Sequence, residues 1–194
     1  MKKLGFIVIL LTLLLAFEAA AQSYNSFAGI QFGSTRESVL EEAMKMGYEV
    51  YSPRGASDRL AIPVFLFGDL PVQVDFLFNK NDKFYSFEIR TGRVERARLD
   101  KAFEAVGYMS EQFTLKYGKP SGSPALNENS SLKESIMNIY QQWYSVKVLD
   151  AYTGLVQKDG RYFAVGAVTH RTLAKEKSSG KSAGKEKASS APVF

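Results

Sequence analysis

Two blocks of alternating apolar residues, one on each side of a long amphipathic segment, constrain the fold of this chain most strongly. In the first block, large apolar residues occupy every second position over 72–78 and again over 85–89, with turn-forming residues between. A period of two is typical of a strand that buries one face. Residues 60–67 are β-rich but contain Pro63, which favours an edge strand or a bulge. The block therefore predicts a three-stranded antiparallel meander.

The second block lies near the other end of the chain and predicts three more strands. Residues 136–148, 149–156 and 161–169 are rich in β-branched and aromatic residues. Asp159 and Gly160 between the last two segments are a strong hairpin signal. Short turns pair strands antiparallel, so we expect a second meander.

A helix is predicted in front of each block. Ser34 and Glu37 have the spacing of a capping box, which starts a helix that continues to about Met46 and ends at Gly47. The second helix covers about 94–117, and Gly118 and Pro120 end it. Its apolar residues recur every three or four positions: Leu99, Ala102, Phe103, Val106, Met109, Phe113 and Tyr117.

The order helix, three strands, helix, three strands predicts an α+β fold. We expect one antiparallel sheet of about six strands with two helices packed on one face, leaving the other sheet face open to water. The repeated order suggests a duplicated helix-plus-meander unit, although no residue-level repeat is visible. The chain has 194 residues, which fits a single domain over 22–173 with additional segments at the two ends.

Residues 1–21 have the pattern of a secretory signal peptide. Lys2 and Lys3 precede an apolar run, and three alanines end with Ala21 as the expected cleavage site. A membrane anchor is the alternative, but the run is short for a span and Glu18 interrupts its end. No cysteine follows for lipid attachment. We therefore expect an exported protein, periplasmic or secreted, without a transmembrane span in its mature form.

The basic charge of the chain is concentrated at its ends. The net charge is +5, but Lys2, Lys3 and the lysines after residue 173 supply most of it. A nearly neutral central segment argues against nucleic-acid binding, which needs a concentrated basic face. Residues 174–194 consist mainly of Lys, Ser, Gly and Ala, which predicts a disordered tail. A weak electrostatic tether to anionic material is the functional alternative.

Few residues are available for catalysis or metal binding. The chain has no cysteine and one histidine, His170, which excludes thiolate sites and a multi-histidine metal centre within one chain. A strand-end histidine is usually at the surface or hydrogen-bonded, and a role in a catalytic triad is the alternative. We predict no catalytic residue, metal or cofactor.

Asp75 and Glu88 fall on adjacent predicted strands beside Arg90. A solvated cross-strand charge pair explains them. The alternative is a pair of catalytic carboxylates, as glycosidases require, and Asp58 and Asp69 are further acids that could join such a pair.

Aromatic residues of the second block are the best binding candidates: Tyr140, Trp143, Tyr144 and Tyr152. In a regular strand Tyr140 and Tyr144 share one face with Tyr152, and Trp143 lies on the other. One set fills the core, while the other would supply Tyr or Trp anchors on the open sheet face. The alternative is that all four are core residues.

Arg93 and Arg96, near the start of the second predicted helix, are candidates for binding an anionic group. A solvated helix face is the alternative explanation, and the dipole at a helix start disfavours cations.

Two stretches have a recognisable pattern: the strand–turn–helix opening from Gly29 to Val39, and the long helix closing in Lys116-Tyr117-Gly118-Lys119-Pro120 before a Trp-bearing strand. They resemble small exported proteins of Gram-negative envelopes. The layout is similar to the β-lactamase-inhibitor-protein fold and to the small lipoproteins of outer-membrane assembly, although this chain lacks their lipidated cysteine. That resemblance implies a binding module.

We therefore expect an exported non-catalytic binding or adaptor domain, with an envelope protein or polysaccharide as partner. A small-ligand carrier or a carboxylate-dependent hydrolase is the alternative.

Overall fold

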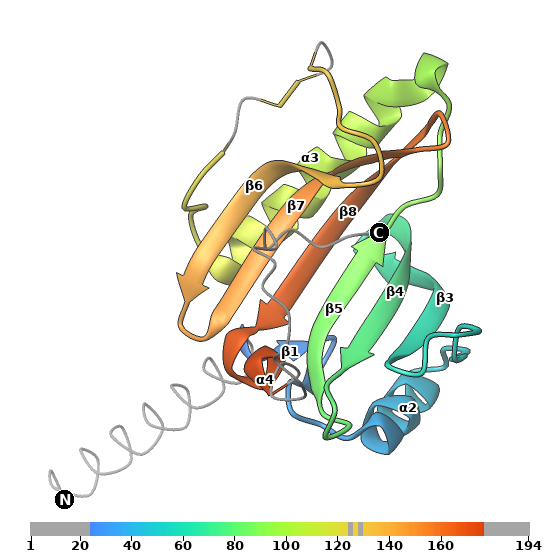
Figure 1. Cartoon of the computed structure of the whole chain (residues 1–194), viewed down its shortest axis with the longest axis vertical. Helices are drawn as coiled ribbons and strands as arrows, with labels where there is room; N and C mark the ends of the chain where they lie inside the picture. Colours follow the sequence, from blue (N-terminus) through green and yellow to red (C-terminus); the bar gives the residue numbers. More distant parts are fainter. Residues whose placement is uncertain (1–23, 124–125, 128–129, 177–194) are drawn as a thin grey trace, which may run out of the picture.

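A six-stranded antiparallel sheet is the main element of the computed structural model, which describes residues 24–123, 126–127 and 130–176 (Figure 1). The first meander consists of β3 (Arg59–Phe67), β4 (Leu70–Phe78) and β5 (Phe84–Arg90), and the second of β6 (Met137–Val146), β7 (Leu149–Lys158) and β8 (Arg161–His170). The strand order is β3-β4-β5-β8-β7-β6, so the meanders join where β5 pairs with β8. The predicted α+β class and six-stranded sheet are confirmed.

Besides the large sheet and the two predicted helices, the described part of the chain contains further short elements. A hairpin of β1 (Ser26–Phe27) and β2 (Ile30–Gln31) precedes α2 (Arg36–Lys45). A 3-10 turn (Arg96–Arg98) leads into α3 (Leu99–Tyr117), which packs on β8 and β7. The short helix α4 (Arg171–Lys175) follows β8. Sequence periodicity does not detect α4 because it has barely more than one turn.

The start of α2 differs by one residue from the prediction. Thr35, not Ser34, is the N-cap, and its hydroxyl accepts a hydrogen bond from the Ser38 amide at 3.3 Å. The Ser34 carbonyl instead accepts a hydrogen bond from the Phe84 amide of β5. This bond keeps Ser34 paired with the sheet, so the helix begins one residue later than predicted. Gly47, with φ +84°, follows the end of the helix as predicted.

The start of α3 is also later than predicted. Val94 exchanges both of its backbone hydrogen bonds with Tyr162 of β8, so the chain at this position is extended rather than helical. The α-helical hydrogen bonds begin only after the 3-10 turn. The predicted end at Tyr117 is confirmed, and Gly118 adopts φ +83° there.

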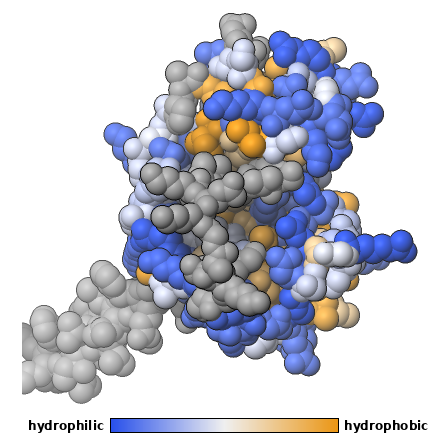
Figure 2. All heavy atoms as spheres, in the orientation of Figure 1, coloured by the Kyte–Doolittle hydropathy of each residue, from blue (hydrophilic) through white to orange (hydrophobic). Residues whose placement is uncertain are grey.

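One large apolar core lies on the α3 side of the sheet. It includes side chains from both meanders, from the β1–β2 hairpin, from α2 and from α3. Its largest fully buried members are Trp143, Phe76, Phe78, Phe84, Phe87 and Phe113. A smaller cluster, which includes Phe163 and Val165, lies on the opposite face. Figure 2 shows one face of the molecule as mostly hydrophilic, with smaller hydrophobic groups between.

Both outer strands of the sheet are irregular. β3 has a register shift between Ile62 and Phe65, on either side of Pro63, as the proline predicts. β6 has two register shifts. On the outer side of β6, Gly122 pairs with Gln142 through backbone hydrogen bonds in both directions.

The predicted signal peptide lies outside the described residues. Of the predicted tail, Ala174 and Lys175 belong to α4, which corrects the expected boundary, and the residues after 176 are also outside the described part. Among the described helices, none has the length and apolar character needed to span a bilayer.

Candidate ligand-binding pocket

The aromatic candidates of the second meander lie on both faces of the sheet. Trp143 is 0% exposed and packs against Phe113 of α3, with ring centroids 5.7 Å apart. Its indole Nε1 donates a hydrogen bond to the Gly118 carbonyl at 2.7 Å, which ties β6 to the end of α3. Trp143 is therefore a core residue in this fold.

Tyr140 does not share a face with Tyr144 and Tyr152. The strand shifts register between Ile139 and Gln141, and Tyr140 packs against the core on the α3 side. The predicted grouping fails here because it assumed a regular strand. Tyr144 and Tyr152 form an edge-to-face pair on the opposite side, with centroids 5.6 Å apart, and Tyr144 is exposed.

Arg93 and Arg96 precede α3 and have separate partners. The Arg93 guanidinium lies 5.7 Å from the Phe163 ring centre and 4.0 Å from an Asp159 carboxylate oxygen. Arg96 donates to the Tyr162 hydroxyl at 3.3 Å. Because Tyr162 and Phe163 point to opposite faces of β8, the structure does not bring the two arginines into one anion site.

The single histidine, His170, caps a helix. His170 is the N-cap of α4, and its Nδ1 accepts a hydrogen bond from the Leu173 amide at 3.3 Å. Burial lowers the pKa of this imidazole. Within the described ranges, no cluster of three or more His, Cys, Asp or Glu side chains could hold a metal ion.

Asp75 and Glu88 are cross-strand partners, as predicted, but they are not solvated. Asp75 is 1% exposed and accepts from Arg59 at 3.1 Å, from Arg90 at 3.0 Å and from Gln73 at 3.0 Å. These interactions occupy both of its carboxylate oxygens. Glu88 is 8% exposed and lies 3.8 Å from Arg90, and burial raises its pKa to about 7.

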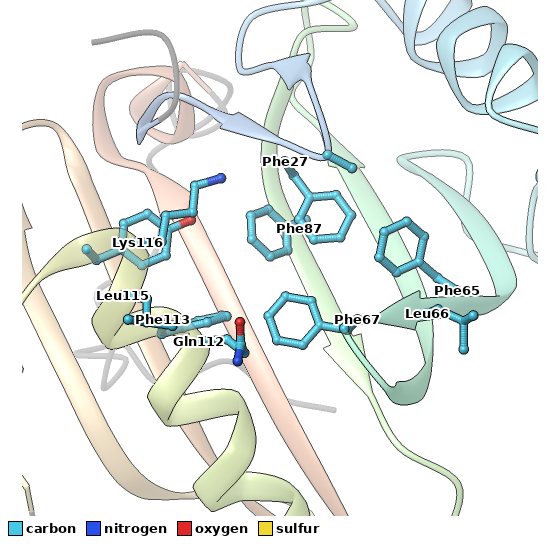
Figure 3. A pocket seen from close by; sticks show the side chains of 12 residues that line it. Phe27, Phe65, Leu66, Phe67, Phe87, Gln112, Phe113, Leu115 and Lys116 are labelled. Atoms are coloured by element: carbon cyan, nitrogen blue, oxygen red, sulfur yellow. The ribbon is translucent and has the colours of Figure 1, made fainter. Parts of the chain in front are cut away.

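A pocket of about 430 Å³ lies between the C-terminal half of α3, the β1–β2 hairpin and β3 (Figure 3). Six aromatic residues contribute to its wall: Phe27, Phe65, Phe67, Phe87, Phe113 and Tyr117. Figure 3 shows the rings of Phe65, Phe67 and Phe87 from the large sheet and of Phe27 from the hairpin across from Gln112, Leu115 and Lys116 of α3. Its volume lies within the range found for small-molecule sites, and most of its lining residues are apolar.

Ring packing holds the sheet side of this pocket in place. Phe27 lies at the junction, with its ring centroid 4.2 Å from that of Phe87, 5.3 Å from that of Phe65 and 5.8 Å from that of Phe76. Such tilted contacts fix the ring positions. The hairpin therefore places an aromatic side chain against both β3 and β5.

The turn between β3 and β4 is fixed to α3 on the other side of the pocket. The Asp69 amide donates to the Tyr108 hydroxyl at 3.2 Å, and a Cβ atom on Gly68 would clash with that oxygen. Gly68 also has φ +61°, which favours glycine. This close approach holds Phe67 beside Phe113, with centroids 6.1 Å apart.

The mouth of the pocket is apolar and its polar groups are few. Leu66 of β3 is 61% exposed and Leu115 of α3 is 80% exposed, and both line it. The Lys116 ammonium donates to the Ser26 carbonyl and lies 5.8 Å from the Tyr117 ring centre. Burial lowers the pKa of Lys116 and raises that of Tyr117. The pocket thus combines an aromatic interior with one polar end.

The sequence did not lead us to this pocket, because its wall comes from segments far apart in the chain. One signal was present. Leu115 lies between Thr114 and Lys116, off the apolar stripe that runs through Phe113 and Tyr117. A single exposed apolar residue is common on protein surfaces, so Leu115 becomes informative only beside the exposed Leu66, which lies 49 positions earlier in the chain and lines the same pocket.

Comparisons with protein-family models, with curated proteins and with solved structures found no match to this chain.

Proposed function

We propose that this protein is an exported, non-catalytic binding domain of a bacterial envelope whose aromatic pocket holds a small apolar molecule. The 430 Å³ pocket beside α3 carries the proposal, because it has the size and lining of a ligand site and its mouth exposes two leucines. The signal-like residues 1–21 support export. The resemblance of the sequence to β-lactamase-inhibitor-protein-like binding modules also favours binding over catalysis.

Binding is favoured over the hydrolase alternative by the state of the acidic pair. Asp75 is 1% exposed and is engaged by two arginines and a glutamine, so its carboxylate is buried in an ion-pair network and is not presented at the surface to a substrate. A second cavity of about 590 Å³ lies nearby, but Asp75 and Glu88 are not among its lining residues. A hydrolytic carboxylate must reach the reacting atoms.

Titration with N-phenyl-1-naphthylamine, a neutral apolar fluorophore, tests the pocket. We expect saturable fluorescence enhancement with the full chain and at least fivefold weaker binding by Leu115→Glu, because a carboxylate at the mouth opposes entry of an apolar molecule. Met44→Glu is the matched control, since Met44 is an exposed apolar residue on α2 outside the pocket. Absence of saturable binding, or equal loss in both variants, would contradict the proposal.

An adaptor role through the opposite sheet face is the second candidate, and Tyr144 beside Tyr152 is the observation that favours it. An envelope protein or polysaccharide is the proposed partner. Capture of such a partner should then be lost in Tyr144→Ala and kept in Leu115→Glu. Trp143→Ala is unsuitable for this test because it would leave a cavity in the core and destabilise the fold.

A further inference from the structure

One residue of the pocket lining, Tyr117, has a buried hydroxyl. Tyr117 is 5% exposed, and its hydroxyl has no hydrogen-bond partner among the described residues. Leaving a buried polar group unpaired is costly, so such groups usually have a partner in the functional state. Because burial raises the pKa of Tyr117, its hydroxyl remains protonated and is a donor. The missing partner is therefore an acceptor.

Lys116, the residue before Tyr117, brings a cation to the same part of the pocket lining, with its ammonium 5.8 Å from the centre of the Tyr117 ring. The Lys116 ammonium has three N–H donors, and one of them serves the Ser26 carbonyl. Within the described part of the chain, no carboxylate forms an ion pair with Lys116, although the side chain is partly buried. The two adjacent residues thus offer a positive charge and a hydrogen bond at one end of an apolar pocket.

A carboxylate matches this pair of donors. It has two acceptor oxygens and no donor, so one oxygen can accept from the ammonium and the other from the hydroxyl. A doubly charged phosphate fits less well, because Tyr117 ends α3 and the C-terminus of a helix carries partial negative charge. A single negative charge is the better complement to a single lysine there.

The apolar part of the pocket lining indicates which group the ligand carries beside its carboxylate. Beyond the polar end the wall is built from phenylalanine rings, and the mouth is flanked by Leu66 and Leu115. An unbranched alkyl chain fills such a space and continues between the two leucines without burying another polar group.

We propose that the pocket binds a fatty-acid-type ligand, a single alkyl chain whose carboxylate is held by Lys116 and Tyr117. This inference rests on the proposed pocket function and names its ligand class. Lys116 and Tyr117 are then the specificity residues: they favour a carboxylate ligand over a neutral ligand with an alkyl chain of the same length.

Paired titrations of the full chain with dodecanoate and dodecanol test the inference. We expect dodecanoate to bind at least tenfold tighter, because hydrogen bonds to a charged acceptor are the stronger ones. Tyr117→Phe and Lys116→Gln should each weaken dodecanoate binding fivefold or more and leave dodecanol binding unchanged. Lys119→Gln, which removes a charge just after the same helix end outside the pocket lining, should change neither.

The outcomes separate the two proposals. If neither ligand binds, the pocket function is wrong and the ligand class with it. If both ligands bind equally and the variants behave like the parent, the pocket function stands and the fatty-acid inference is overturned. Tyr117→Phe removes a hydroxyl that forms no hydrogen bond within the described part of the chain, so the variant should keep its fold. Thermal unfolding checks this for both variants.

Discussion

Glu88 lies on the sheet face opposite α3, between Asp75 of β4 and Ala167 of β8. Its Oε1 atom is 3.8 Å from the Arg90 guanidinium and accepts no hydrogen bond from any residue in the described ranges. Burial raises the pKa of this carboxyl to about 7, and the attraction of Arg90 only partly opposes the effect. The alternation of β4 and β5 placed Asp75 and Glu88 on one face, but alternation carries no information on how deeply that face is buried.

Glu88→Gln should remove a pH dependence of stability. A raised pKa in the folded protein means that Glu88 stabilises the fold below its ordinary value of 4.5, and that this contribution is lost as the pH rises through about 7. We expect the variant to match the parent near pH 4 and to exceed it at pH 8, by at most about 3 kcal/mol in the free energy of unfolding. Urea unfolding at pH 4, 6 and 8 measures the difference, and a difference that is constant with pH would contradict the assignment.

At the scale of elements, local signals were sufficient where local contacts decide the structure. The turn at Asp159-Gly160 and the alternation of β4 and β5 predicted strands that the structure contains. Helix starts were less accurate because distant strands compete for the same backbone groups. The backbone of Ser34 is hydrogen-bonded to Phe84, and the backbone of Val94 is hydrogen-bonded to Tyr162. The register shift that turns Tyr140 toward α3 depends likewise on the pairing of β6 with β7. The pocket also depends on distant contacts, because its lining comes from several separate elements.

Gly68→Ala should loosen the β3–β4 turn from α3. The new Cβ atom would meet the Tyr108 hydroxyl, and φ +61° is unfavourable for alanine, so we expect a loss of about 1–3 kcal/mol in stability. Gly92→Ala is the control, because a Cβ atom there meets nothing within 4 Å. Chemical unfolding compares the two variants. Equal effects would show that the close approach to Tyr108 is unimportant.

At the scale of the whole molecule, the two meanders share one core. Leu60 and Phe87 of the first and Trp143 and Leu155 of the second belong to the same cluster as the inner face of α3. The sequence predicted each meander, but the strand order that joins β5 to β8 depends on contacts between distant segments and could not be derived from periodicity. We infer that the two halves unfold together.

Leu60→Ala tests this cooperativity, because Leu60 lies in β3 while the single tryptophan, Trp143, reports from β6. Removing a buried leucine side chain should cost about 2–5 kcal/mol. Tryptophan fluorescence and far-UV circular dichroism should therefore show the same shift in urea midpoint. Met44→Ala, at an exposed site, should shift neither. An unchanged fluorescence midpoint in Leu60→Ala would mean that the halves unfold separately.

The irregular outer strands also affect how copies of the protein behave at high concentration. A free strand edge is a template on which another chain can extend a sheet, and growth of that kind leads to aggregates. On β3 the proline and the register shift interrupt the row of donors and acceptors, and on β6 the Gly122–Gln142 pairing already occupies part of the row. Edge-to-edge association of two sheets is therefore disfavoured at both outer strands, and we expect the protein to resist aggregation by sheet extension.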